Sequence, residues 1–167
     1  MTGYREFGIG QDDEGIGSPP KRLLEVELVP ATVWGANLRS ILKPAEWDRL
    51  RKAVYERAGH RCEICGGKGR KHPVEAHEKW EYDDTAHVQK LVGIEALCPD
   101  CHGVKHIGRL SMTGEAAFTR GLRHLAKVNG WPLKEAREYV SVAFLDWQTR
   151  SEHPWTLDIS WLRDAKL

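Results

Sequence analysis

The sequence predicts an α+β fold built around a small metal-stapled core, with a strand near each end of the chain and a pair of helices in its C-terminal half. Three observations support this prediction. The four cysteines form two CxxC pairs, and none is left over. Short stretches in which apolar and polar residues alternate indicate strands. Two longer stretches repeat their apolar residues with the spacing of an amphipathic helix.

The N-terminal third is expected to pack on this core. Residues 1–22 are rich in glycine and charge and are expected to form a flexible tail. The next segment, 23–58, is expected to supply a strand and a helix. Apolar residues alternate with glutamates over 24–29, which is the period of a half-buried strand. Apolar residues then follow at helical spacing over 44–58, and Gly59 is expected to end this helix.

The metal-stapled core is predicted over residues 59–108, which contain both cysteine pairs. We expect it to hold a strand, a polar connection, a second short strand and a helix, in that order, over 74–80, 81–90, 94–97 and 99–108.

The C-terminal part, 109–167, is predicted to be a helical pair followed by a strand. The apolar periodicity predicts helices over 114–128 and 132–150, with the Asn-Gly pair at 129–130 separating them. Alternation over 155–161 predicts the closing strand, which we expect to pair with 24–29.

Length, charge and the absence of sorting signals narrow the protein class. A chain of 167 residues suits one domain with an extension. The formal net charge is only +1, so any contact with nucleic acid must depend on local basic patches. No apolar run approaches the roughly 20 residues that a membrane-spanning helix needs. The first residues also lack the apolar centre of a signal peptide, so we expect a cytoplasmic protein.

The cysteine pairs are the strongest chemical signal in the chain. They are Cys62 with Cys65 and Cys98 with Cys101. Each pair can supply two thiolates to one ion, and together they can make a closed tetrahedral site for structural Zn²⁺. Disulfides and a thiol redox centre are the alternatives. A cytoplasmic location disfavours disulfides, and a redox protein would need only one reactive pair.

The residues around these pairs resemble the HNH endonucleases, a ββα-metal (His-Me finger) family, in their four-cysteine form. The resemblance covers about residues 47–108. It rests on three stretches, which read GHRCEIC at 59–65, EAH at 75–77 and LCPDCH at 97–102. In this family two strands and a helix hold one divalent metal ion, and the cysteine-bound zinc staples the motif.

The resemblance implies an enzyme that hydrolyses phosphodiester bonds in nucleic acid, with DNA the preferred substrate. It implies that His77 is the general base that activates water, and that His102 binds Mg²⁺ or another divalent metal at the start of the helix. Such a metal would stabilise negative charge on the phosphate.

Two positions depart from the family pattern. The residue before the base is usually a metal ligand, and here it is Ala76. The Asn that usually orients the base-bearing loop is replaced by Gly93. These departures leave an alternative open, which is a catalytically degenerate HNH zinc scaffold that binds nucleic acid or a protein partner.

Other residues could supply the missing ligand. His106 follows His102 by one helical turn and is the preferred candidate, followed by Glu78 and then Asp84. Glu75 and Glu78 flank His77, and we expect both to point to the opposite strand face unless a bulge intervenes. Each candidate also has a purely structural interpretation, as a helix-end histidine, an ion-pairing carboxylate or a turn cap.

Nucleic-acid contacts are expected from basic residues beside the two cysteine pairs, because phosphates need such cations. The candidates are Arg61, Lys68, Arg70, Lys105 and Arg109, with Arg57 and Lys71 nearby. The sequence leaves open DNA against RNA and the oligomeric state, with a homodimer among the options.

Overall fold

The computed structural model describes residues 24–165, apart from the side chain of Asp164. The flexible tail predicted for residues 1–22 therefore lies outside the described residues. Within the described part, helices and a three-stranded mixed sheet form an α+β fold, as predicted.

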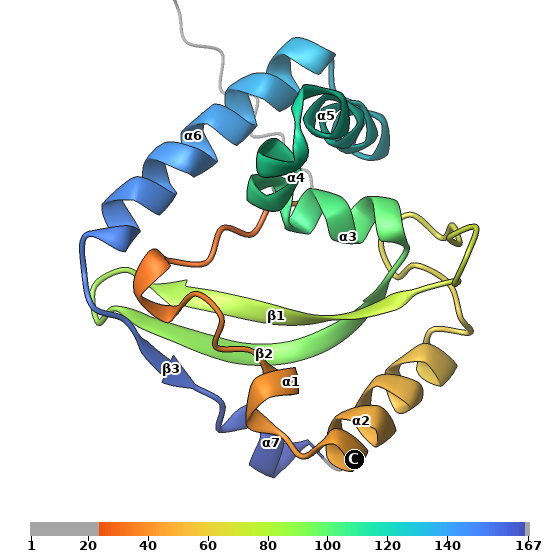
Figure 1. The fold of residues 1–167 in the computed structure, drawn as a ribbon, viewed down its shortest axis with the longest axis vertical. Coiled ribbons are helices and arrows are strands. Elements are labelled where there is room, and N and C mark those ends of the chain that lie inside the picture. Colours follow the sequence, from red (N-terminus) through yellow and green to blue (C-terminus); the bar gives the residue numbers. More distant parts are fainter. Residues whose placement is uncertain (1–23, 166–167) are drawn as a thin grey trace, which may run out of the picture.

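A long β-hairpin lies at the centre of the molecule (Figure 1). Strand β1 (Glu75–Asp83) pairs antiparallel with β2 (Val88–Leu97), and β3 (Thr156–Asp158) adds to β2 in parallel. The predicted polar connection over 81–90 is wrong, because both strands continue through most of it. Charged residues on the outer part of the hairpin alternate with half-buried aromatic ones, and the turn takes only residues 84–87.

The hairpin carries one β-bulge, close to the residues of interest. Lys79 pairs with Gly93 and Trp80 pairs with Leu91, so Val92 is the extra residue of β2. A bulge bends its strand and increases the local twist.

Helices cover the sheet from both sides (Figure 1). On one side lie α3 (Pro99–Lys105), α4 (Ile107–Thr113), α5 (Glu115–Asn129) and α6 (Leu133–Ser151). On the other side lie α1 (Leu38–Ile41), α2 (Pro44–Arg57) and α7 (Trp161–Asp164). A 3₁₀ turn, η1 (Ala31–Val33), meets the C-terminal end of α6, where Ser151 accepts the Ala31 N–H.

Each side has its own hydrophobic core. The first core joins α3 to α6 and contains Leu97, Ile107, Leu122 and Leu125. The second lies between the hairpin and α2 and includes Trp47. The helices predicted over 44–58, 114–128 and 132–150 are confirmed as α2, α5 and α6. Each could be predicted because it buries one apolar face.

The strand predicted over 24–29 is wrong. Residues 24–30 have no regular secondary structure and pack between helices instead of joining the sheet. Their polar backbone groups bond to side chains and to a helix end. Asn129 bonds both the N–H and the C=O of Leu24, at 3.0 and 2.8 Å, and Glu27 N–H donates to the Lys105 carbonyl at 2.8 Å. The closing strand predicted over 155–161 is shorter than expected: it is β3, and it pairs with β2 instead of with 24–29. Helix α7 begins soon after it.

The helix predicted over 99–108 is two helices with a break at His106. Its backbone angles, φ −97° and ψ 43°, end α3 and redirect the chain into α4. The His106 N–H still donates to the His102 carbonyl at 3.1 Å, so these two residues remain one turn apart.

Candidate metal centres

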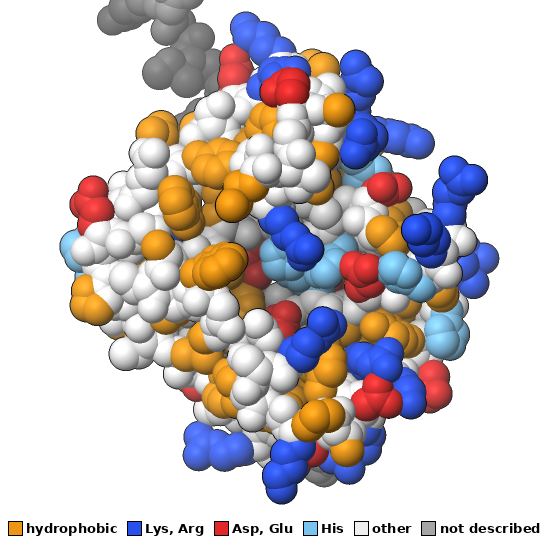
Figure 2. Space-filling model, viewed as in Figure 1, with side chains coloured by type: hydrophobic (Ala, Val, Ile, Leu, Met, Phe, Trp, Pro, Cys, Tyr) orange, Lys and Arg blue, Asp and Glu red, His pale blue; other side chains and the backbone are white. Residues whose placement is uncertain are grey.

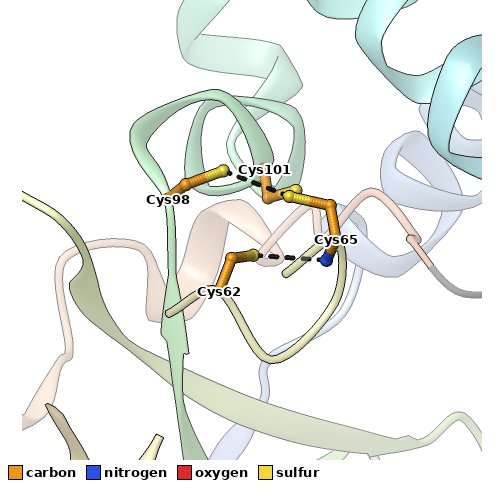
Figure 3. Close-up of side chains that lie close together, drawn as sticks. All are labelled: Cys62, Cys65, Cys98 and Cys101. Carbon is orange, nitrogen blue, oxygen red and sulfur yellow. Dashed lines mark hydrogen bonds between the residues drawn. The ribbon is translucent and has the colours of Figure 1, made fainter. Parts of the chain in front are cut away.

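The four cysteines meet where the chain leaves α2 and where it enters α3 (Figure 3). All four sulfur atoms lie within 4.8 Å of one another. The sulfurs of Cys65 and Cys98 are 3.6 Å apart. Tetrahedral Zn–S bonds of about 2.3 Å put neighbouring sulfurs about 3.8 Å apart. The cluster can therefore hold a metal ion such as zinc.

Local hydrogen bonds bring the first cysteine pair to the second. The Gly66 N–H donates to the Cys62 carbonyl and the Cys62 N–H donates to the Gly67 carbonyl, both at 2.9 Å, which closes the loop around the pair. Glu63 then joins this loop to the end of β2. Its N–H donates to the Ala96 carbonyl at 2.9 Å, and its carboxylate accepts the Ala96 N–H at 2.6 Å.

The thiols of Cys62, Cys98 and Cys101 differ strongly in pKa. A hydrogen bond from Cys101 lowers the pKa of Cys62 to about 4. Burial raises the pKa of Cys98 to about 11, and the hydrogen bond to Cys62 together with burial raises the pKa of Cys101 further. A divalent cation would favour ionisation of all of them, because it stabilises every coordinating thiolate.

His124 contacts the cluster from α5, and sequence reasoning missed it. Its Nε2 lies 3.1 Å from the Cys101 sulfur. A ring N–H in this position can donate to a thiolate and orient it. No motif marks His124 in the sequence, because it lies 23 residues after Cys101 and reaches it only through the packing of α5 on α3.

A second cluster consists of His77 on β1, His102 on α3 and His106 at the α3–α4 break. One ring nitrogen of each lies within 4.8 Å of the others, so this histidine triad can also hold a metal ion. The three rings meet edge to face, with centroids 4.8 to 5.3 Å apart. In the view of Figure 2, histidine side chains gather near the centre of the molecular surface, with lysine and arginine side chains around them.

Glu75 orients the triad from the start of β1. His102 donates from Nδ1 to its carboxylate, and His72 donates to its other oxygen. A metal-binding histidine usually has such a carboxylate on its second nitrogen. The expectation that Glu75 points away from His77 is wrong, because residues two apart on a strand share a face.

His77 lies in an enclosed charged environment. Its side chain is 1 % exposed, and neither ring nitrogen has a hydrogen-bond partner among the described residues. Glu27 Oε1 lies 3.5 Å from its Nε2. Glu95 is its cross-strand neighbour, and the Lys105 Nζ lies 3.5 Å from Glu95 Oε1.

Burial controls protonation in this region. It lowers the pKa of His77 and of His106 to about 3, so both imidazoles are neutral at pH 7. Neutral imidazole is the form that binds metals. Burial also raises the pKa of Glu27 to about 8 in the metal-free protein, although nearby Lys105 opposes the shift.

The two carboxylates considered as extra ligands lie elsewhere. Glu78 accepts the Leu38 N–H at 3.0 Å, on the opposite face of the hairpin, and so caps the start of α1. Asp84, at the hairpin turn, forms a two-point ion pair with Arg150 of α6, at 2.6 and 2.8 Å. Neither residue joins the histidine triad.

The predicted nucleic-acid contacts divide by exposure. Arg61, Lys68 and Arg70 are exposed beside the first cysteine pair, and Arg109 is exposed at α4. Lys105 is only 8 % exposed and pairs with Glu95, so little of its side chain reaches the surface, and its contact with phosphate stays a prediction. Arg57 bonds Glu63 and the Ile94 carbonyl and so has a structural role.

Comparison with known protein families, with curated proteins and with solved structures gives no match for this chain. None of the helices within residues 24–165 combines the length and the apolar character needed to cross a membrane.

Proposed function

We propose that the protein is a metal-dependent HNH endonuclease that hydrolyses phosphodiester bonds in nucleic acid, with DNA the preferred substrate. The observation that carries this proposal is the histidine triad beside a four-cysteine cluster. His77 comes from the first strand of a hairpin, His102 comes from the helix that follows it, and His106 lies just after the end of that helix. This order of strand, strand and helix supports a ββα-metal core.

Each histidine has a role that fits its position. His102 and His106 would hold a divalent cation such as Mg²⁺, whose charge would stabilise negative charge on the phosphate. His77 would accept the proton of the attacking water. The low pKa values of His77 and His106 keep both rings neutral, which is the form that binds metals. Glu75 would fix the orientation of His102.

The cysteine cluster would hold a structural Zn²⁺. Four sulfur ligands leave no open position for chemistry. The site would join the loop after α2 to the start of α3, and so it would hold the hairpin and the helix in the arrangement that forms the triad.

A second candidate is a zinc-stapled scaffold that binds nucleic acid or a protein partner without cutting. The burial of His77 favours it, because a general base must reach the attacking water and His77 is only 1 % exposed. Ala76 adds to this argument. It pairs with Ala96 and packs into the second core, so the position before His77 offers no ligand to the triad.

Nicking of supercoiled plasmid with and without Mg²⁺ or Mn²⁺ separates the two candidates. The parent protein, confirmed to be folded and zinc-loaded, is compared with His77→Ala and with His60→Ala as a matched control. His60 is an exposed histidine just before the first cysteine pair.

We expect metal-dependent nicking by the parent and by His60→Ala, and its loss in His77→Ala. If the folded, zinc-loaded parent does not nick plasmid with either metal, the nuclease proposal fails and the binding scaffold takes its place. Equal nicking by His77→Ala would instead remove His77 from the role of base.

A further inference from the structure

Glu27 has a buried carboxyl group beside the histidine triad and belongs to none of the motifs found in the sequence. Its side chain is 9 % exposed, and its Oε1 lies 3.5 Å from His77 Nε2. That separation exceeds a good N–H···O hydrogen bond by about 0.5 Å, which a small side-chain rotation can close. Both ring nitrogens of His77 are buried without a hydrogen-bond partner among the described residues, an arrangement that is unfavourable for a polar group.

The backbone around Glu27 is fixed in place from several sides. The Glu27 N–H donates to the Lys105 carbonyl at the end of α3, at 2.8 Å. The neighbouring Val26 N–H donates to the Tyr139 hydroxyl of α6 at 3.3 Å. Two residues earlier, Glu25 is exposed and lines a surface groove along α6 instead. The carboxylate is thus placed toward His77 by its whole segment.

Glu75, another acidic side chain beside the triad, already makes the kind of contact that we infer for Glu27. Glu75 already accepts the Nδ1–H of His102. In metal sites the histidine nitrogen that does not bind the metal commonly donates to a carboxylate, which fixes the ring and its tautomer. Glu27 lies beside a ring nitrogen of His77, as Glu75 lies beside a ring nitrogen of His102.

We propose that Glu27 is a positioning residue for His77, whose Nε2–H it accepts when a metal ion occupies the triad, so that Nδ1 keeps the lone pair. The proposal rests on the proposed function only in that the triad binds a metal. With Zn²⁺ in the triad, His77 Nδ1 would be the third nitrogen ligand. With a catalytic cation held by His102 and His106 alone, the same lone pair would accept the proton of the attacking water. The proposal also assigns the segment 24–30, which lies outside the 59–108 core, to the site. The resemblance to HNH enzymes does not reach this segment.

The test uses the full chain with two equivalents of Zn²⁺ and compares four proteins. These are the parent, Glu27→Leu, Glu27→Gln and, as a matched control from the same segment, Glu25→Gln. Nitrogen-15 NMR of the imidazole rings identifies which nitrogen of His77 is protonated. Competition with a chelator measures the affinity for each zinc equivalent, and circular dichroism checks folding.

We expect the parent to carry its proton on His77 Nε2. Glu27→Leu should weaken binding of the second zinc by about 10- to 100-fold and leave the first unchanged. Glu27→Gln keeps an oxygen that can accept the N–H, so it should stay near the parent affinity, as should Glu25→Gln.

Two results overturn the proposal for Glu27 alone: parent-like binding of the second zinc by Glu27→Leu, or a parent His77 that is protonated on Nδ1 and metallated on Nε2. The NMR result on the parent decides the matter even if Glu27→Leu does not fold. Binding of only one zinc by the parent would overturn the metal-binding triad itself, together with this inference. Two bound zincs with no plasmid nicking would remove the nuclease and leave the role of Glu27 intact.

Discussion

Gly69 lies where the loop after the first cysteine pair passes the start of α3, and it offers a sharp test of how the cysteine cluster is built. A Cβ added there would lie 2.2 Å from the His72 carbonyl oxygen and 2.6 Å from Pro99 Cδ. Ordinary contacts between such atoms are about 3.5 Å, so the overlap is about 1 Å. One partner is backbone and the other is a ring, so neither can rotate away. The Gly69 N–H also bonds the Pro73 carbonyl at 2.9 Å, which ties the loop to itself.

We therefore expect Gly69→Ala to push the loop away from Pro99 and separate the two cysteine pairs. Overpacking of this kind costs about 1–3 kcal/mol. At about 2 kcal/mol, the Tm of the zinc-loaded protein should fall by roughly 4–8 °C. Thermal unfolding measures the shift, and chelator competition measures the accompanying loss of zinc affinity.

Gly93→Ala is the matched control, because a Cβ there meets nothing within 4 Å and its φ is not in the left-handed region. It should unfold within about 2 °C of the parent, which is less than 1 kcal/mol for a chain of this size. A Gly69→Ala protein with the parent's Tm and zinc affinity would refute the geometry described for this loop.

Three further predictions follow from the buried groups. His124→Leu should weaken zinc binding at the cysteines by about 10-fold, measured by chelator competition, because it removes the group that orients Cys101; unchanged affinity would contradict this role. Lys105→Met should lower the free energy of unfolding by about 3–5 kcal/mol in urea, because it leaves the carboxylate of Glu95 without its cation, whereas a mere phosphate contact would leave stability unchanged. With no metal on the triad, the free energy of unfolding should fall as the pH drops from about 6.5 toward 3. The pKa of His106 is held at about 3 in the folded protein, so in this range the unfolded chain binds more protons than the folded one. His106→Asn should reduce this dependence of stability on pH.

Some of the site could be predicted from the sequence because its parts are close together in the chain. A CxxC pair brings two sulfurs together whatever the rest of the fold does, and His102 follows the second pair directly. The helices α2, α5 and α6 were also predictable, since each repeats its apolar residues with the helical period over three or more turns.

The sequence pattern gave the wrong prediction for segments whose hydrogen-bond partners lie far away in the chain. Residues 24–29 alternate like a strand, but Asn129 and the end of α3 supply their hydrogen-bond partners, so no strand forms. The hairpin is longer than predicted because pairing between the two strands stabilises polar residues that carry no strand signal on their own.

The four cysteines and the three histidines of the candidate metal centres could all be singled out from the sequence, because ligand chemistry depends on residue type and short spacing, although His77 was expected as a base and His106 only as the preferred one of three further ligands. Which other side chains surround these residues depends on the tertiary packing. It placed Glu75 on His102, Glu27 beside His77 and His124 on Cys101, and it buried Lys105 against Glu95. Most of these contacts join segments more than 20 residues apart, so they depend on how helices and hairpin pack, and no local pattern encodes that packing.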